Sequence, residues 1–408
     1  MRVSSSYATI SSAVADLSSV VEDTFSNANM RNIIFELHTD GTMCLIGINQ
    51  VVTVKQSFTP DVMQVSLDPT DTLNSNGKFY FQINSKELRD YLNAYKGVRQ
   101  TVVDEVIFET GERGKIKCTI IESDKPSDSE FMYENEPKKY ASYWHFDNIP
   151  IPNTLFLNIN YQAPEGELTD LSTDAIIYFT STLFPILENG NSAYSCATFT
   201  ENSIIVSHPA FVTVVKSALQ DDKIFKDIRL TYKAFEYLDR VARSNQYIGV
   251  ARAERYIDIK TDVQEVFLTY DTKIPNYKVI LETLNRDSVV TINRIYMKDV
   301  VKRLSLLNDN IEFHINASNN MITLKNSRFS QDININFQRS MEELGNIKFK
   351  LMPAVINKAI IGNDDACIYD NPYGRDIFLY FVKTPRGMAV FISDASGAWF
   401  SRAEVKTY

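Results

Sequence analysis

The 408-residue sequence has few cysteines, no net positive charge and no long apolar run. Its four cysteines lie far apart and form no C-x-x-C pair, which argues against a disulfide framework or a cysteine zinc site. No uninterrupted apolar segment is long enough to span a bilayer. The first 25 residues lack a compact apolar core and carry three acidic residues, which favours a helix over a signal peptide. The sequence therefore predicts a cytoplasmic protein without a membrane segment.

The chain is acidic and long. A formal charge of −9 argues against binding of nucleic acid over the whole surface, but it is compatible with a local basic surface. The length exceeds what one ordinary core accommodates, so we expect two or three globular domains.

Motifs typical of enzymes are also missing. The sequence contains no P-loop, no G-x-G-x-x-G after a strand, no H-E-x-x-H and no G-x-S-x-G. The four histidines occur singly in strand-like segments, where packing or surface roles are more common than catalysis. The acidic segment 362–371 lacks the spacing of an EF-hand loop, and we interpret it as a turn after a helix. We therefore predict no enzymatic activity, no metal and no cofactor.

The sequence does contain a repeated strand–helix–meander pattern. Residues 228–262 begin with strand-like alternation, continue into an amphipathic helix and return as two short strands. Copies four, five and six start 61 and 58 residues apart, a spacing typical of repeated supersecondary units. The same order recurs in five further segments, 7–58, 79–121, 155–217, 289–325 and 347–393.

Signals within these copies predict individual turns and strands. Asp40–Gly41 and Gly111–Gly114 predict tight turns. In the third copy the pattern predicts strands near 193–200 and 203–217. The polar segment 123–139 is expected to form an exposed loop before the last strand of the second copy.

Two proline-containing joints divide the six copies into pairs. The tripeptide Ile-Pro-Asn occurs at 151–153 and again 123 residues later, and proline favours extended, linker-like backbone. Two copies per segment and two joints predict an α+β protein of three similar domains. Their expected bounds are 1–147, 148–272 and 273–408.

Three of the predicted helices carry cations opposite their apolar residues. In the helix of the fourth copy, Phe235, Leu238, Val241 and Ala242 fall on one side. A basic helix face is often only a solvated face. The same polarity in three corresponding helices of an acidic chain favours a surface that faces phosphates. With one lysine of the sixth copy, the candidate DNA-binding residues are Lys86, Arg89, Lys96, Lys233, Arg240, Arg243, Arg294, Lys298, Lys302 and Lys358.

This organisation resembles the bacterial-type DNA sliding clamp, the processivity ring of replicative polymerases. The closest local match, IPNYKVIL at 274–281, is similar to the connector that enters the third clamp domain. The following SVVTINRIYMKDVVKRLSLL is similar to the first strand and helix of that domain. The resemblance covers most of the chain as a pattern and is specific over about 228–325.

The resemblance implies the DNA-clamp fold, with helices lining a central hole, sheets outside, and two chains joined head to tail into a ring. The basic residues would then contact the phosphates of encircled double-stranded DNA without reading bases. The implied partners are a replicative DNA polymerase and a clamp-loader ATPase. The matching positions of the partner pocket are Pro275, Tyr277, Val279 and Ile280.

Some segments depart from the family pattern. The end of the chain, 397–408, does not resemble the apolar, Met-Pro-containing C-terminus of bacterial clamps, and 200–208 lacks the usual pocket residues. The helices predicted at 7–26 and 172–187 have almost no basic residues. A diverged, phage-encoded clamp with its own polymerase is compatible with these departures. The alternatives are a clamp-fold interaction protein that regulates host replication or transcription without encircling DNA, and an enzyme with an unrecognised site.

Overall fold

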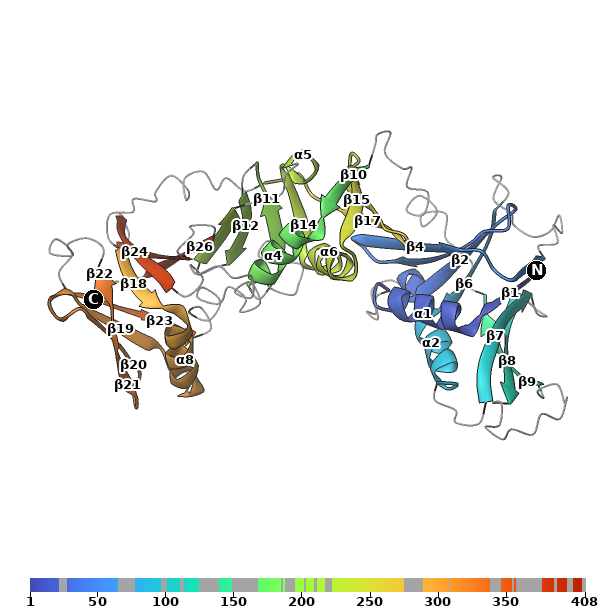
Figure 1. Ribbon diagram of the computed structural model, residues 1–408, viewed down its shortest axis with the longest axis horizontal. Helices are drawn as coiled ribbons and strands as arrows, with labels where there is room; N and C mark the ends of the chain where they lie inside the picture. Colours follow the sequence, from blue (N-terminus) through green and yellow to red (C-terminus); the bar gives the residue numbers. More distant parts are fainter. Residues whose placement is uncertain are drawn as a thin grey trace, which may run out of the picture. The chain divides into compact units, whose positions relative to one another are not determined.

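The computed structural model consists of two compact units (Figure 1). One comprises Met1–Leu168 with Tyr256–Leu268, and the other Thr169–Arg255 with Thr269–Tyr408. No helix in the described ranges is long and apolar enough to cross a membrane. The structure describes residues 1–21, 28–64, 78–96, 101–110, 114–124, 139–148, 168–184, 186–187, 195–201, 203–208, 211–216, 222–274, 289–307, 309–337, 346–353, 356, 376–384, 387–394 and 399–405.

In its described residues, the first compact unit contains the α-helices α1 and α2 and two runs of paired strands. One sheet has the order β5-β1-β7-β8-β9, and the other includes β16-β17-β4-β3-β2-β6. Its elements are β1 (Arg2–Ser6), α1 (Tyr7–Ser18), η1 (Ala28–Arg31), β2 (Asn32–His38), β3 (Met43–Ile48), β4 (Val52–Phe58), β5 (Val62–Gln64), β6 (Lys78–Asn84), α2 (Ser85–Asn93), β7 (Thr101–Thr110), β8 (Lys115–Asp124), β9 (Lys139–Asp147), β16 (Tyr256–Lys260) and β17 (Glu265–Thr269).

The second compact unit contains a nine-stranded sheet of order β14-β11-β12-β13-β26-β25-β24-β18-β22, a four-stranded sheet β21-β20-β19-β23, and the pair β10-β15. Its elements are β10 (Thr169–Ser172), α4 (Thr173–Leu183), β11 (Cys196–Phe199), β12 (Ser203–His208), β13 (Phe211–Lys216), α5 (Asp222–Phe225), β14 (Ile228–Thr231), α6 (Tyr232–Ser244), β15 (Tyr247–Arg252), β18 (Val289–Asn293), α8 (Arg294–Leu304), η3 (Ser305–Leu307), β19 (Ile311–Asn316), η4 (Ala317–Asn319), β20 (Met321–Lys325), β21 (Ser330–Asn334), β22 (Asn336–Phe337), β23 (Ile347–Leu351), β24 (Asp376–Thr384), β25 (Gly387–Asp394) and β26 (Trp399–Val405).

The predicted repeat is confirmed, with a crosswise strand exchange that the sequence does not reveal. In each pair of repeats, the first strand of one pairs with the first meander strand of the other. The pairings are β1 with β7 and β6 with β2, then β10 with β15 and β14 with β11, then β18 with β24 and β23 with β19. The helix predicted near 352–361 in the sixth repeat lies mostly outside the described residues.

The third meander strands join neighbouring pairs of repeats. Strand β4 pairs antiparallel with β17, and β13 pairs antiparallel with β26. The two remaining third strands, β9 and β21, lie at the ends of their sheets. Among the described residues, neither has another third strand beside it.

Each of the five described helices that follow a first strand begins at a side-chain cap. The cap residue is the last residue of the strand, and its oxygen accepts a hydrogen bond from a backbone N–H in the first helical turn, which satisfies a donor that the helix leaves open. The caps are Ser6, Asn84, Ser172, Thr231 and Asn293.

Equivalent positions in the first and third pairs of repeats hold the same aromatic stack. Phe35 of β2 and Phe81 of β6 are register partners, and their ring centroids lie 4.5 Å apart. Phe313 of β19 and Phe349 of β23 are register partners at 4.6 Å. All four rings are buried and fill the core between sheet and helices.

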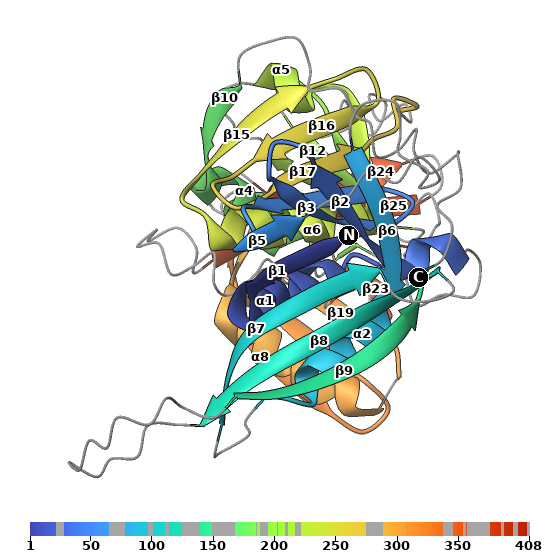
Figure 2. The ribbon, with the colours of Figure 1, turned by 90° about the vertical axis from the view of Figure 1, so that its right-hand side faces the viewer.

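The helices lie on one side of the sheets and pack on one another. Helices α1 and α2 are in contact, and both lie on the same side of β7, β8 and β9 (Figure 2). Gly47 of β3 allows α1 to come close, since a Cβ there would lie 3.2 Å from the backbone oxygen of Leu17. The sheets therefore leave one face of each helix pair open to solvent.

Two local predictions have different outcomes. The Asp40–Gly41 turn is confirmed, because Gly41 adopts a φ of +92° and the Asp40 carboxylate accepts a hydrogen bond from the Thr42 N–H. The single strand predicted at 203–217 is wrong, because the structure divides this segment into the antiparallel strands β12 and β13. Of the Gly111–Gly114 turn, only Gly114 is described, with a φ of +73°. Most of the loop predicted at 123–139 lies outside the described residues.

Candidate nucleic-acid interface

Helix α6 exposes all three of its predicted cations. Lys233, Arg240 and Arg243 reach solvent, whereas the apolar residues predicted for the opposite side are buried in the core. The helix is amphipathic because its apolar residues recur at 3.6-residue spacing and its charged residues occupy the remaining positions.

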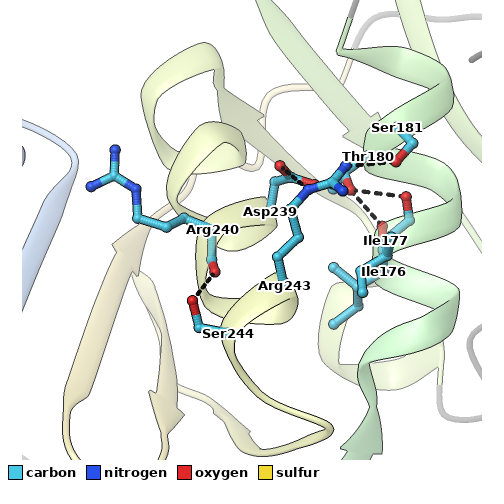
Figure 3. A network of polar contacts seen from close by, with 8 residues as sticks. All are labelled: Ile176, Ile177, Thr180, Ser181, Asp239, Arg240, Arg243 and Ser244. Carbon is cyan, nitrogen blue, oxygen red and sulfur yellow. Dashed lines mark hydrogen bonds and ion pairs between the residues drawn. The ribbon is translucent and has the colours of Figure 1, made fainter. Parts of the chain in front are cut away.

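Two of these cations already have carboxylate partners on the same helix. Lys233 Nζ lies 3.5 Å from the Glu236 carboxylate. Arg243 Nε donates a 2.9 Å hydrogen bond to Asp239, and Arg243 Nη2 donates a 2.7 Å bond to Ser181 Oγ on α4 (Figure 3). The positive charge of α6 is therefore partly neutralised within the helix.

Arg240 has a different setting from Arg243. Its side chain points away from the Asp239 network (Figure 3). Its guanidinium lies 5.2 Å from the ring centroid of Tyr237, a cation–π distance, and the residue is exposed.

The cations of the second repeat lie on and just beyond α2. Lys86 and Lys96 are exposed, and Lys96 lies three residues after Asn93, the last helical residue. Arg89 is half-buried, and its Nε lies 3.9 Å from the Asp90 carboxylate. This helix thus presents two lysines to solvent at its two ends.

Helix α8 is the most basic of the described helices, with four cations and one carboxylate. Lys302 is exposed and Lys298 is half-buried. Arg294 is only 9% exposed, so its guanidinium lies largely within the protein. Arg303, which the sequence prediction omitted, is exposed and donates from Nε to the Asp299 backbone oxygen. The sequence signal for Arg303 was its position on the polar side of the last turn of an amphipathic helix.

The neighbouring helices carry no cations. The exposed residues of α1 are small or hydroxyl-bearing apart from Asp16, and α4 exposes only Asp174. Since α1 contacts α2 and α4 contacts α6, each pair combines a basic helix with a helix that has none. The remaining candidates, Lys358 and the pocket positions Pro275, Tyr277, Val279 and Ile280, lie outside the described residues.

Cations on the outward sheet faces form ladders with carboxylates. Arg2 and Lys117 flank Glu109 at 3.6 and 3.5 Å. Lys350 and Lys325 flank Glu312 at 2.5 and 3.2 Å, and these lysines lower the pKa of Glu312 to about 2. These cations balance local acidic charge, as is usual on a mixed surface.

Two arginines that the sequence prediction omitted fix the start of the connector around 270–274. Arg229 exchanges two backbone hydrogen bonds with Asp271 and donates from Nη1 to the Lys273 oxygen. Arg252 Nε donates to the Tyr270 hydroxyl, which in turn lies within hydrogen-bond distance of the Ala253 oxygen. These hydrogen bonds hold residues 270–273 beside β14 and the turn after β15.

The two sheet edges without a third-strand partner carry exposed apolar side chains. On β9, Tyr143 and Trp144 are exposed on opposite faces, Trp144 by 57%. Near β21, Leu306 is 81% exposed in η3, which directly follows α8. Asn326 in the turn before β21 donates to the Leu304 oxygen, which places this helix end beside the turn. The signal in the sequence was an aromatic run, KYASYWHFD, that is apolar on both strand faces.

The fold is similar to solved bacterial clamps over its whole length. A putative DNA polymerase III beta subunit from Eubacterium rectale matches with a TM-score of 0.71 and 14% identity, covering 99% of this chain and 98% of that one. Caulobacter crescentus pol III beta matches with 0.71 and 10%, covering 99% of both chains. The Helicobacter pylori beta clamp bound to a DNA ligase peptide matches with 0.67 and 11%, covering 99% of both. No protein-family model and no curated protein sequence matches the chain.

The chain thus has the α+β DNA-clamp fold, built from pairs of strand–helix–meander repeats. It resembles the bacterial-type DNA polymerase sliding clamp in structure and is diverged from it in sequence.

Proposed function

We propose that this protein is a DNA sliding clamp, a ring that encircles duplex DNA without sequence specificity and tethers a replicative DNA polymerase. The observation that carries the proposal is the exposed cations on α2, α6 and α8, on the helix side of a full-length clamp fold. Lysine and arginine contact phosphates irrespective of base sequence, and retention by a closed ring does not require tight contacts. The DNA-facing residues are proposed to be Lys86, Arg89, Lys96, Lys233, Arg240, Arg243, Lys298, Lys302, Arg303 and Lys358.

The ring is proposed to form from two chains joined head to tail. Four of the six third strands pair within the chain, which leaves β9 at a sheet edge of the first compact unit and β21 at a sheet edge of the second. An open strand edge is a template for pairing with another chain. Pairing β9 of one copy with β21 of the next would again join two third meander strands, as β4–β17 and β13–β26 do within the chain. Two such junctions close a ring of two chains.

The side chains around these edges support this assembly. Tyr143 and Trp144 are exposed on β9, while Leu306, Tyr296 and Phe329 are exposed around β21. Large aromatic and aliphatic side chains are the usual anchors of protein interfaces. Joining the two edges would remove both apolar patches from water.

Partners and domains follow from the same proposal. We propose a non-enzymatic protein of three domains, 1–147, 148–272 and 273–408, that acts with a DNA polymerase and a clamp-loader ATPase. The similar Helicobacter pylori clamp is bound to a DNA ligase peptide, which supports peptide docking as the mode of partner binding. In this chain the docking pocket is proposed to include Pro275, Tyr277, Val279 and Ile280.

Retention on circular DNA tests the proposal. The protein is incubated with nicked circular DNA during assembly, and the complex is separated by gel filtration in high salt. We expect protein to co-elute with circles and to be lost when the same circles are linearised, because a ring slides off a free end. Equal loss from circles and linear DNA would reject encirclement. That result would favour the alternative of a clamp-fold regulator that does not encircle DNA. The observation that supports this alternative is the lack of cations on α1 and α4.

A further inference from the structure

The hydrogen-bond network between α4 and α6 gives Asp239 two partners. Its Oδ1 lies 2.5 Å from Thr180 Oγ1, and its Oδ2 accepts from Arg243 Nε at 2.9 Å (Figure 3). Thr180 is fully buried, and its hydroxyl also lies near the backbone oxygens of Ile176 and Ile177. A hydroxyl has one proton, so these three acceptors share a single donor. The Thr180 hydroxyl therefore does not always donate to Asp239, and the Asp239 carboxylate is not rigidly fixed beside Arg243.

The acceptors around Arg243 have the arrangement that a phosphate would supply. Asp239 and Ser181 each present one oxygen to the guanidinium, at 2.9 and 2.7 Å. A phosphate group also offers two oxygens to a guanidinium. The Arg243 side chain is 47% exposed, so a phosphate can approach it from solvent. Glu236 stands in the same relation to Lys233, at 3.5 Å.

We propose that Asp239 and Glu236 are positioning residues that weaken the binding of α6 to DNA. Asp239 competes with phosphates for Arg243, and Glu236 competes with them for Lys233. This inference rests on the proposed function, because it assumes that α6 faces duplex DNA. Each phosphate contact of Arg243 or Lys233 then forms by exchange with an internal carboxylate. The exchange lowers the net binding free energy of each phosphate contact, so the ring moves along the duplex without being held at one place.

The test measures binding of a short fluorescent duplex at two salt concentrations. A short linear duplex threads through a ring without a loader, so its affinity reports the contacts inside the hole and not topological retention. Asp239→Asn removes the competing charge with little change of shape. We expect tighter binding in low salt, and an advantage over the unchanged protein that shrinks about 3-fold between about 50 and 200 mM salt, the dependence of one additional phosphate contact.

Two controls separate the mechanism from simple charge. Asp262→Asn makes the same charge change at an exposed position outside α6 and is expected to leave binding unchanged. In the Arg243→Gln background, Asp239→Asn is expected to have no effect, because the competed cation is absent. An equal gain from Asp262→Asn, or an unchanged gain in the Arg243→Gln background, would overturn the inference.

A second variant guards against misfolding. If thermal unfolding shows that the Asp239→Asn protein is unfolded, Glu236→Gln gives the same test, with Lys233 as the released cation. The Glu236 side chain is 37% exposed, so this substitution is expected to preserve folding. Wild-type behaviour on circular DNA is measured in parallel. Retention on circles with no response to either variant rejects this inference alone, whereas no retention and no duplex binding reject the proposed function and this inference together.

Discussion

At the scale of single residues, Asp258 on β16 is the most unusual carboxyl group of the described chain. It is fully buried, and Lys260 Nζ lies 3.7 Å away, beyond hydrogen-bond distance. Burial, followed by the charge of Glu265, raises the pKa of Asp258 to about 6. The folded protein therefore holds a proton here over a pH range in which the unfolded chain has released it.

The first prediction concerns stability against pH. Because the folded-state pKa is raised, the folded protein binds more protons than the unfolded chain between about pH 4 and 6, and stability falls as pH rises through that window. Above it, ionised Asp258 costs at most about 3 kcal/mol. Asp258→Asn is expected to raise the free energy of unfolding at pH 7.5 and to have little effect at pH 4, measured by urea unfolding. A loss of stability at pH 7.5 would contradict this account.

The second prediction concerns Gly47, where α1 approaches β3. A Cβ at this position would lie 3.2 and 3.3 Å from Leu17 O and Leu17 Cβ, closer than an ordinary contact. Gly47→Ala is therefore expected to lower the free energy of unfolding by about 1–3 kcal/mol, since a packed core resists extra volume. Gly41→Ala is a useful comparison, because a Cβ there meets nothing within 4 Å and only its positive φ opposes the change. Both are measured by urea unfolding.

At the scale of elements, the capped helices support a third prediction. Asn293 accepts a 3.0 Å hydrogen bond from the Tyr296 N–H and so defines the start of α8. Asn293→Ala is expected to destabilise the protein by about 1 kcal/mol, and Asn293→Ser to retain most of the stability, because serine also caps helices. Urea unfolding followed by circular dichroism distinguishes the two. Equal values for both substitutions would show that the cap contributes nothing.

Elements were largely predictable from sequence because their signals are local. The apolar face of α6 follows from 3.6-residue periodicity, and its predicted core residues are buried. The single strand expected at 203–217 failed because alternation continues across a hairpin and does not mark where the chain reverses. The crosswise strand exchange was not predictable, since register partners such as Arg2 and Glu109 lie far apart in sequence.

The candidate site was predictable only in part. Periodicity identified which cations share a helix face, and Lys233, Arg240 and Lys302 are exposed as expected from that pattern. The burial of Arg294 and the pairing of Arg243 with Asp239 depend on tertiary neighbours, which periodicity does not report. Their DNA-binding roles remain predictions.

At the scale of the whole molecule, a fourth prediction tests head-to-tail assembly. Trp144→Glu alters the β9 edge and Leu306→Glu the β21 edge, and both side chains are exposed, so folding should be preserved. Light scattering is expected to show a dimer for the unchanged protein and a monomer for each variant, since a buried charge without a partner disfavours an interface. Tyr247→Glu, at an exposed position on neither edge, is expected to stay dimeric.

Mixing the two variants gives the sharper result. The Trp144→Glu chain keeps an intact β21 edge and the Leu306→Glu chain keeps an intact β9 edge. One unaltered junction can therefore form between them, and the mixture is expected to give an open dimer. If Leu306→Glu remained dimeric while Trp144→Glu did not, the β9 edge would instead pair with itself, and a head-to-tail ring would be excluded.

The crosswise exchange of first strands also has a consequence during synthesis. Strand β1 leaves the ribosome before its partner β7, which pairs with it through residues as late as Glu109. The first repeat therefore emerges with its opening strand and the apolar side of α1 uncovered, and it closes only when most of the second repeat has been translated. A nascent chain that ends before β7 therefore exposes an apolar surface that chaperones can bind. The same exposure recurs each time synthesis of a new pair of repeats begins.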